Sequence, residues 1–211
     1  EHICGSESAF VEAMNRRAKE LGMQDTHFVN CTGLDDDDSA KLHRTSAYDI
    51  ALMSRELLKN HPTIQKYTTI WMDTIRNGSF GLSNTNKLIR FYDGATGLKT
   101  GYTASAGYCI SATAERDGME LIAVIMKAPD KDTRTKDAKA LLNYGFSTYA
   151  LVSAAPEESL PVLLVSMGET EQVPLMLPEE GVTALVEKGR ANALTRRIDL
   201  PEGLTAPIAA G

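Results

Sequence analysis

The stretch that decides the fold reads GLKTGYT at residues 97–103. A turn-forming YDG precedes it at residues 92–94, and two runs rich in strand formers follow, so we expect residues 97–103 to form a strand. Gly101 adds no side chain, which leaves room for the backbone of a ligand along the strand edge. Lys99 and Thr100 supply a cation and a hydroxyl there. The alternative is an ordinary edge strand with a solvated lysine.

The residues after this strand predict a hairpin and a helix. Residues 108–114 and 120–126 are two β-like runs on either side of Asp117-Gly118, a dipeptide that favours a two-residue hairpin turn. Residues 133–146 then have apolar side chains at helical spacing. The apolar positions of this predicted helix are Ala138, Leu141, Leu142 and Phe146.

Two helices are predicted before the strand. Residues 6–21 are amphipathic, and Ser6 or Ser8 can serve as the N-cap. A second helix, capped by Thr45 or Ser46, ends at a His-Pro dipeptide because the residue before proline disfavours the helical conformation.

The segments between the helices and the strand are more irregular. Residues 35–38 are four consecutive aspartates that lack the alternating spacing of a calcium loop, so we expect a solvated acidic turn. Residues 68–71, 74–75 and 88–91 carry side chains typical of strands. Helices, then an antiparallel meander, then a helix predict an α+β fold with helices packed against the sheet.

The C-terminal part of the chain predicts a small all-β module. A boundary is expected near residues 152–156, beyond which helical periodicity is poor. We therefore divide the chain into residues 1–150 and residues 151–211, the second lacking a convincing last strand, as in a truncated domain. The short β-like runs of the second part are residues 160–165, 172–176, 183–186 and 193–198.

The composition is that of an ordinary globular protein, with 43% hydrophobic and 24% charged residues. The net charge of −6 argues against a nucleic-acid-binding surface, which needs a basic stripe. The three cysteines have no metal-binding spacing, and the four histidines share no motif. We therefore expect no metal and no organic cofactor, and we expect each histidine to be a surface or packing residue.

Several short motifs follow one another in a fixed order along the chain. Besides Lys-Thr-Gly at residues 99–101, they are AMN (13–15), KELGM (19–23), THFVN (26–30), TGL (32–34), TSAYDIALM (45–53), AGY (106–108) and LLNYGF (141–146). Lys-Thr-Gly is one signature of the penicillin-recognising serine enzymes. Together the motifs resemble those of the serine-type D-alanyl-D-alanine carboxypeptidases, the low-molecular-weight penicillin-binding proteins of peptidase family S11.

The resemblance implies a penicillin-binding, β-lactamase-like α+β fold. Residues 1–150 are then the C-terminal part of a transpeptidase-like catalytic domain. Residues 151–211 are then the β-rich C-terminal domain that such enzymes carry.

The resemblance also implies roles for individual residues. Substrate peptide would add to the strand edge as an extra strand, and the backbone N–H of Tyr102 would be one donor of the oxyanion hole. Arg134 would reach the terminal carboxylate, because its planar guanidinium can bind two oxygens. Without the resemblance, the three aspartates near Arg134 favour a helix-surface arginine. The substrate-binding residues implied in this way are Lys99, Thr100, Gly101, Thr103 and Arg134.

The chain departs from the family pattern in one respect. No Ser-x-x-Lys and no Ser-x-Asn occurs among the 211 residues. In the family these motifs supply the nucleophile, its lysine base and the middle triad. We therefore expect the chain to be a C-terminal portion, inactive alone and completed by an N-terminal segment of the same protein.

The expected function is removal of the terminal D-Ala from peptidoglycan pentapeptide through a serine acyl-enzyme, as part of cell-wall synthesis and cell shape. Two alternatives are a serine β-lactamase-like hydrolase, which shares Lys-Thr-Gly, and a catalytically silent cell-wall peptide-binding protein. The expected partners are the peptidoglycan stem peptide and β-lactams, with no nucleic acid. By resemblance we expect an extracytoplasmic, secreted location, with peripheral membrane association through a C-terminal segment absent from this chain.

Overall fold

The computed structural model describes residues 2–35, 38–156, 158–177, 182–195 and 197–208. The chain divides into two compact units, residues 1–146 and residues 147–211. Within the described ranges, no helix is both long enough and apolar enough to cross a bilayer.

The first unit is built on a three-stranded antiparallel sheet in the order β3–β4–β5. These strands are β3 (Ala95–Thr103), β4 (Gly107–Arg116) and β5 (Met119–Ala128). The central strand β4 is buried from Ile110 to Ala114, whereas β3 pairs only with β4 and is an edge strand of the described sheet. The predicted hairpin turn is confirmed, since Asp117 and Gly118 have φ of 51° and 74°, as a type I′ turn requires.

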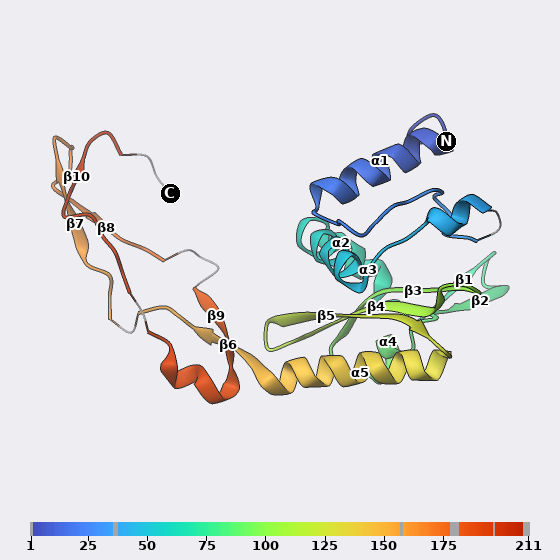
Figure 1. Cartoon of the computed structure of the whole chain (residues 1–211). Helices are drawn as coiled ribbons and strands as arrows, with labels where there is room; N and C mark the ends of the chain where they lie inside the picture. The colour runs from blue at the N-terminus through green and yellow to red at the C-terminus, as the bar shows by residue number, and fades with distance from the viewer. Residues whose placement is uncertain (1, 36–37, 157, 178–181, 196, 209–211) are drawn as a thin grey trace. The chain divides into compact units, whose positions relative to one another are not determined.

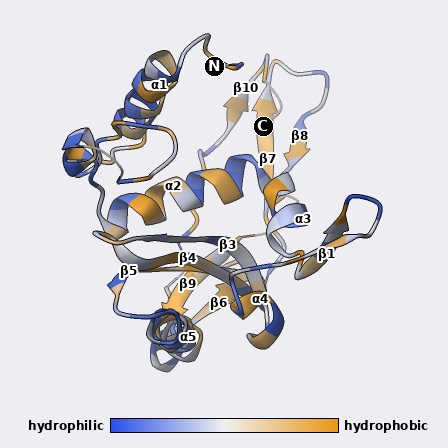
Figure 2. Cartoon of the chain, turned by 90° about the vertical axis from the view of Figure 1, so that its right-hand side faces the viewer, coloured by the Kyte–Doolittle hydropathy of each residue, from blue (hydrophilic) through white to orange (hydrophobic). Residues whose placement is uncertain are grey.

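Helices lie on both faces of this sheet (Figures 1 and 2). On one face is α2 (Ala47–Asn60), whose N-cap Ser46 accepts a hydrogen bond from a backbone N–H of its first turn. On the other face is α5 (Lys131–Thr148), which buries Ala138, Leu142 and Phe146 as predicted but leaves Leu141 exposed. The α+β fold with helices packed against an antiparallel sheet is therefore confirmed.

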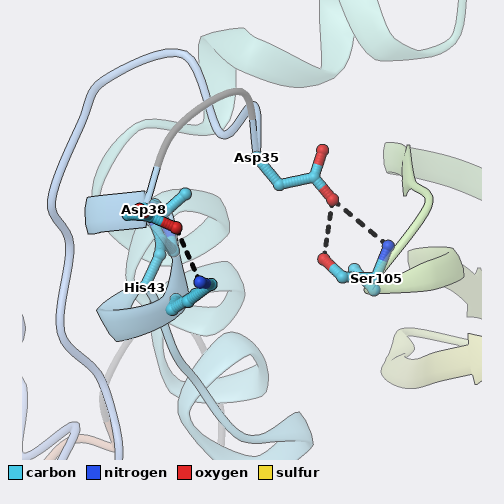
Figure 3. Close-up of a pocket in the computed structure, with 7 residues that line it drawn as sticks. Asp35, Asp38, His43 and Ser105 are labelled. Atoms are coloured by element: carbon cyan, nitrogen blue, oxygen red, sulfur yellow. Dashed lines mark hydrogen bonds and ion pairs between the residues drawn. The ribbon is translucent and has the colours of Figure 1, made fainter.

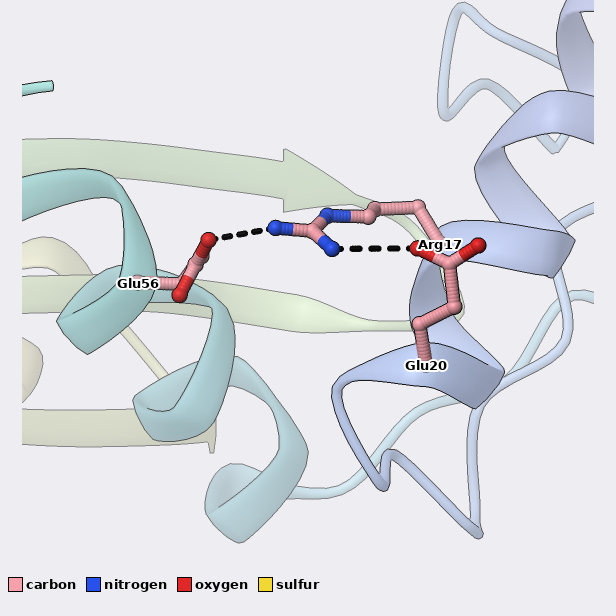
Figure 4. A network of polar contacts seen from close by, with 3 residues as sticks. All are labelled: Arg17, Glu20 and Glu56. Atoms are coloured by element: carbon pink, nitrogen blue, oxygen red, sulfur yellow. Dashed lines mark hydrogen bonds and ion pairs between the residues drawn. The ribbon is translucent and has the colours of Figure 1, made fainter. Parts of the chain in front are cut away.

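The remaining long helix is α1 (Glu7–Glu20), and polar contacts join its region to α2. Its N-cap is Ser6, as predicted. Arg17 contacts both Glu20 of α1 and Glu56 of α2 (Figure 4). All three side chains are at least partly exposed, so solvent screens both ion pairs and they contribute little to stability. The fully buried Asp49 accepts hydrogen bonds from the backbone and a hydroxyl of the connector that leads from α1 to α2.

Short elements connect α2 to the sheet, and here the structure corrects the predicted strands. They are η2 (Pro62–Ile64), α3 (Gln65–Thr68), β1 (Met72–Ile75), β2 (Phe80–Ser83) and α4 (Leu88–Phe91), whereas η1 (Asp38–Leu42) precedes α2. Residues 74–75 lie in the β1–β2 hairpin. Residue 68 instead ends α3, residues 69–71 form no strand, and residues 88–91 are the helix α4. The reason at α4 is a local side-chain hydrogen bond, since Asn86 Oδ1 accepts from the N–H of the fully buried Leu88 at 3.1 Å.

The predicted acidic turn is only partly described. Asp36 and Asp37 lie outside the described residues. Asp35 and Asp38 are both exposed, and Asp38 begins η1.

The second unit consists of two small sheets. β6 (Tyr149–Ser153) pairs with β9 (Thr183–Glu187), and β7 (Val162–Ser166) lies between β8 (Gln172–Pro174) and β10 (Leu204–Thr205). The prediction of a strand over residues 193–198 is wrong for the described residues, because η3 (Lys188–Ala193) ends there and no strand follows directly. Lys188 and Gly189 begin that helical turn immediately after β9, and they interrupt the alternating pattern of a strand.

Candidate anion-binding site

A cavity of about 430 Å³ lies beside the first unit's edge strand β3. One wall is formed by residues 99–102 of β3 together with Tyr108 of β4. Another is formed by residues 83–85 and Lys87, in the connection from β2 to α4, and a third by the first turn of α5. Trp71 also lines the cavity, which therefore joins segments more than sixty residues apart in the sequence.

The charged side chains of the cavity wall are positive. Four cationic side chains line it, and no aspartate or glutamate of the described ranges does: Lys87, Lys99, Lys131 and Arg134. Within the same ranges, only Lys87 is offset by a carboxylate, that of Asp132 at 3.5 Å, whose side chain is 91% exposed. Such a wall attracts an anion and disfavours a cation.

Arg134 is the most unusual of these residues because it is 5% exposed. Its Nη1 donates a long hydrogen bond of 3.4 Å to the carbonyl of Cys109, and its buried Nε has no hydrogen-bond partner among the described residues. Burial lowers the pKa of the guanidinium, which nevertheless stays charged because an arginine pKa starts so high. A buried cation without a counter-ion is unfavourable, so this group is suited to bind an anion from the cavity.

The alternative interpretation of Arg134 as a helix-surface arginine near three aspartates is therefore wrong. Asp130 caps the start of α5 instead, accepting from the backbone N–H and the hydroxyl of Thr133 at 2.7 and 2.8 Å. These hydrogen bonds lower the pKa of the Asp130 carboxyl. Asp132 faces Lys87. Asp130 therefore caps the helix and Asp132 forms a surface ion pair, and neither is paired with Arg134.

The structure brings most of the residues expected from the sequence into this cavity. Lys99 donates from Nζ to the carbonyl of Thr100 at 2.5 Å, and the Thr100 hydroxyl lies 2.6 Å from that of Thr85. A Cβ atom added at Gly101 would meet no described protein atom within 4 Å, so the space along the strand edge is open. Tyr102 also lines the cavity, and its ring lies 4.3 Å from that of Tyr108.

Thr103 does not line this cavity, although residues 99–102 line both this cavity and the one that Thr103 lines. It lines a second cavity of about 390 Å³ between β3 and α2, which is mainly apolar. Its hydroxyl accepts from the N–H of Ala106 at 3.0 Å, which orders the turn after β3.

A wider cavity of about 930 Å³ lies at the end of that turn (Figure 3). Here Asp35 accepts from the hydroxyl and the N–H of Ser105 at 2.7 and 3.2 Å, a contact that we call the Asp35–Ser105 clasp. These hydrogen bonds lower the pKa of the Asp35 carboxyl. Nearby, Asp38 pairs with Lys41, and burial lowers the pKa of His43. Within the described ranges, no three His, Cys, Asp or Glu side chains gather as a metal site would require.

Sequence reasoning missed seven residues that line this cationic cavity: Trp71, Ser83, Asn84, Thr85, Lys87, Tyr108 and Lys131. Lys131 could have been found, because it lies three residues before Arg134 and so shares its face of the helix. Thr85 and Lys87 gave no such signal. They lie in a polar stretch that is typical of a loop.

The chain is similar in sequence to one group of enzymes. A family model described as D-alanyl-D-alanine carboxypeptidase, Peptidase S11, matches residues 1–130. The chain is 37% identical over 216 aligned residues to D-alanyl-D-alanine carboxypeptidase DacF of Bacillus subtilis, and 30% identical over 217 to DacC of Escherichia coli. Both alignments cover all of this chain but only 54% and 52% of the relative. The chain therefore spans about half the length of the curated relatives it matches.

Solved structures show the same relationship. Penicillin-Binding Protein D2 of Listeria monocytogenes, in its cefotaxime-bound form, is 38% identical, with a TM-score of 0.60 over 65% of this chain and 55% of that one. Penicillin binding protein 5 of Haemophilus influenzae is 28% identical, with a TM-score of 0.72 over all of this chain and 60% of that one. PBP3 of Streptococcus pneumoniae, also 28% identical, gives a TM-score of 0.75 over 90% of this chain and 58% of that one.

Proposed function

We propose, from the premise that the chain belongs to the D-alanyl-D-alanine carboxypeptidase family, that it forms the carboxylate-recognising part of a serine D-Ala-D-Ala carboxypeptidase. The substrate is the peptidoglycan pentapeptide, from which the enzyme removes the terminal D-Ala. The reaction passes through a serine acyl-enzyme. The 211 residues contain no Ser-x-x-Lys, so the proposed nucleophile comes from outside this sequence.

One observation carries this proposal. A buried Arg134 without a counter-ion among the described residues lines the same cavity as Lys99 and Thr100. A carboxypeptidase differs from an endopeptidase in recognising a free terminal carboxylate, and charge-assisted hydrogen bonds from fixed cations suit that task. The carboxylate in this proposal binds between Arg134 and the Thr100 hydroxyl.

The rest of the substrate lies along β3 in the proposal. Because β3 is an edge strand of the described sheet, an extended peptide can add to it by backbone hydrogen bonds, with Gly101 leaving room and Thr103 contributing its backbone. The N–H of Tyr102 is then one oxyanion donor, a kind of group whose loss costs about 10²–10³ in rate.

Two further features of the whole protein follow from the proposal. It binds β-lactams, as the Listeria monocytogenes relative does in its cefotaxime- and ampicillin-bound forms. It also works outside the cytoplasmic membrane, where peptidoglycan lies, in cell-wall synthesis and the maintenance of cell shape.

The test is to express the complete gene product and measure two reactions. One is release of D-Ala from a pentapeptide, followed by mass spectrometry. The other is covalent labelling by a fluorescent penicillin. We expect both reactions, with slow hydrolysis of the penicillin. Rapid turnover of the penicillin without D-Ala release would identify a β-lactamase-like hydrolase, and peptide binding with neither reaction would identify a silent binding protein.

A further inference from the structure

A pair of threonine hydroxyls is set into the wall of the cationic cavity. Oγ1 of Thr85 lies 2.6 Å from Oγ1 of Thr100, which is a short distance for a hydrogen bond between two hydroxyls. Both residues line the cavity with Arg134. Thr100 belongs to the Lys-Thr-Gly strand, whereas Thr85 comes from the connection between β2 and α4.

The position of Thr85 is fixed by its two asparagine neighbours. Asn84 donates from Nδ2 to the carbonyl of Ile70 at 3.0 Å, and Asn86 donates from Nδ2 to the carbonyl of Gly97 at 2.8 Å. The two asparagines are also joined, since the N–H of Asn86 donates to Oδ1 of Asn84 at 2.9 Å. Asn86 is buried, so the backbone on either side of Thr85 is anchored to the body of the unit.

The chemistry of the ligand decides the direction of the hydrogen bond between the threonines. An ionised carboxylate can only accept hydrogen bonds, and each threonine hydroxyl has a single hydrogen to donate. When Thr100 donates its hydrogen to a carboxylate, it can still accept one. Thr85 then has to be the donor in the pair, and donation to Thr100 polarises the Thr100 hydroxyl and strengthens its bond to the anion.

We propose that Thr85 is a positioning residue that orients the Thr100 hydroxyl toward the carboxylate of the ligand, a role that rests on the proposed function. Thr85 thereby contributes to discrimination between a free C-terminal carboxylate and its amide. An amide ligand also offers N–H donors, so it does not require the Thr100 hydroxyl to point outward.

The test uses the complete gene product with two probes, N-acetyl-D-alanyl-D-alanine and its C-terminal amide, titrated by NMR. Thr85→Val keeps the shape of the side chain but removes the hydroxyl, and Thr85→Ser restores it. We expect Thr85→Val to weaken binding of the acid about three- to tenfold, with little change for the amide, as expected for one lost hydrogen bond. Thr85→Ser should return the affinity to that of the wild type.

Thr74→Val is the matched control, because Thr74 is exposed on β1 and does not line the cavity. It should leave both affinities unchanged. Wild-type affinity for the acid in Thr85→Val, or equal losses for the acid and the amide, would overturn the role of Thr85 while leaving the proposed function standing. A wild-type chain that binds neither probe, or binds both equally, would overturn the proposed function and the role of Thr85 with it.

Discussion

Replacement of Arg134 by methionine should make the protein more stable and less able to bind a carboxylate. Methionine has a similar length and no charge, so it fills the buried site without the desolvated cation. Relieving an unpaired buried polar group stabilises a protein by about 1–3 kcal/mol. At about 2–4 °C per kcal/mol for a chain of this size, the melting temperature should rise by several degrees. A lost hydrogen bond to a charged group, about 1.5–3 kcal/mol, should weaken binding of a free carboxylate about 10- to 150-fold.

Trp71 allows both effects to be measured with one signal. It is the single tryptophan of the chain and it lines the cationic cavity, so its fluorescence reports unfolding of the first unit and binding of a ligand. The matched control is Arg116→Met. Arg116 donates to the carbonyl of Asp93 at 3.1 and 2.8 Å, and its guanidinium lies 4.6 Å from the ring centres of Tyr92 and Phe146. Because the Arg116 guanidinium has both hydrogen-bond and aromatic partners, its replacement should destabilise the protein.

The opposite signs of the two substitutions are the critical result. If Arg134→Met lowers the melting temperature as much as Arg116→Met does, then Arg134 is a structural arginine with partners in the free protein. If Arg134→Met weakens binding of the acid and the amide of a D-Ala-D-Ala peptide equally, then the guanidinium does not contact the carboxylate. Either result would refute the reasoning about this cavity.

Three further predictions concern β3, its following turn and the turn before it. Lys99→Ala in the complete gene product should reduce acylation by a fluorescent penicillin at least about tenfold, in line with the loss of a charged hydrogen bond, and full labelling would exclude a role as an anchor. The Asp35–Ser105 clasp should be present above the pKa of Asp35 in the unfolded chain and lost as the pH falls through the lowered pKa of Asp35 in the folded protein, because hydrogen bonds from Ser105 favour the ionised carboxylate. An Asp35 titration midpoint at or above the ordinary pKa of 3.8, measured by NMR, would contradict this. Gly94→Ala should destabilise the first unit more than Gly22→Ala does, although both glycines have φ of +78°. An added Cβ would lie 2.3 Å from a backbone carbonyl oxygen at Gly94, whereas at Gly22 it would contact nothing among the described residues. Equal losses of stability of about 1–2 kcal/mol, the cost of the left-handed conformation alone, would show that the overlap at Gly94 is relieved.

The regular elements of the first unit could be predicted from the sequence because their signals are local. The Asp117-Gly118 turn fixes the β4–β5 hairpin, and Ser6 and Ser46 begin α1 and α2 through their side chains. The segment at residues 88–91 could not be predicted in the same way. Its residues favour a strand, but a hydrogen bond from the Leu88 N–H to the Asn86 side chain and complete burial of Leu88 favour a helical turn.

The candidate site could likewise be predicted only in part from the sequence. The Lys-Thr-Gly strand is visible in the sequence because glycine, lysine and threonine are adjacent there. The burial of Arg134 is not visible, since it depends on how α5 packs on the sheet and on the use of Asp130 as a helix cap. Thr85 enters the cavity only because its asparagine neighbours attach a connecting segment to the body of the unit.

The most direct measurement is a crystal structure of the protein with N-acetyl-D-alanyl-D-alanine bound. We expect the terminal carboxylate to lie in the cationic cavity, within hydrogen-bond distance of the Arg134 guanidinium and the Thr100 hydroxyl, with the peptide extended along β3. A carboxylate bound elsewhere, with Arg134 still unpaired beneath an empty cavity, would contradict this expectation.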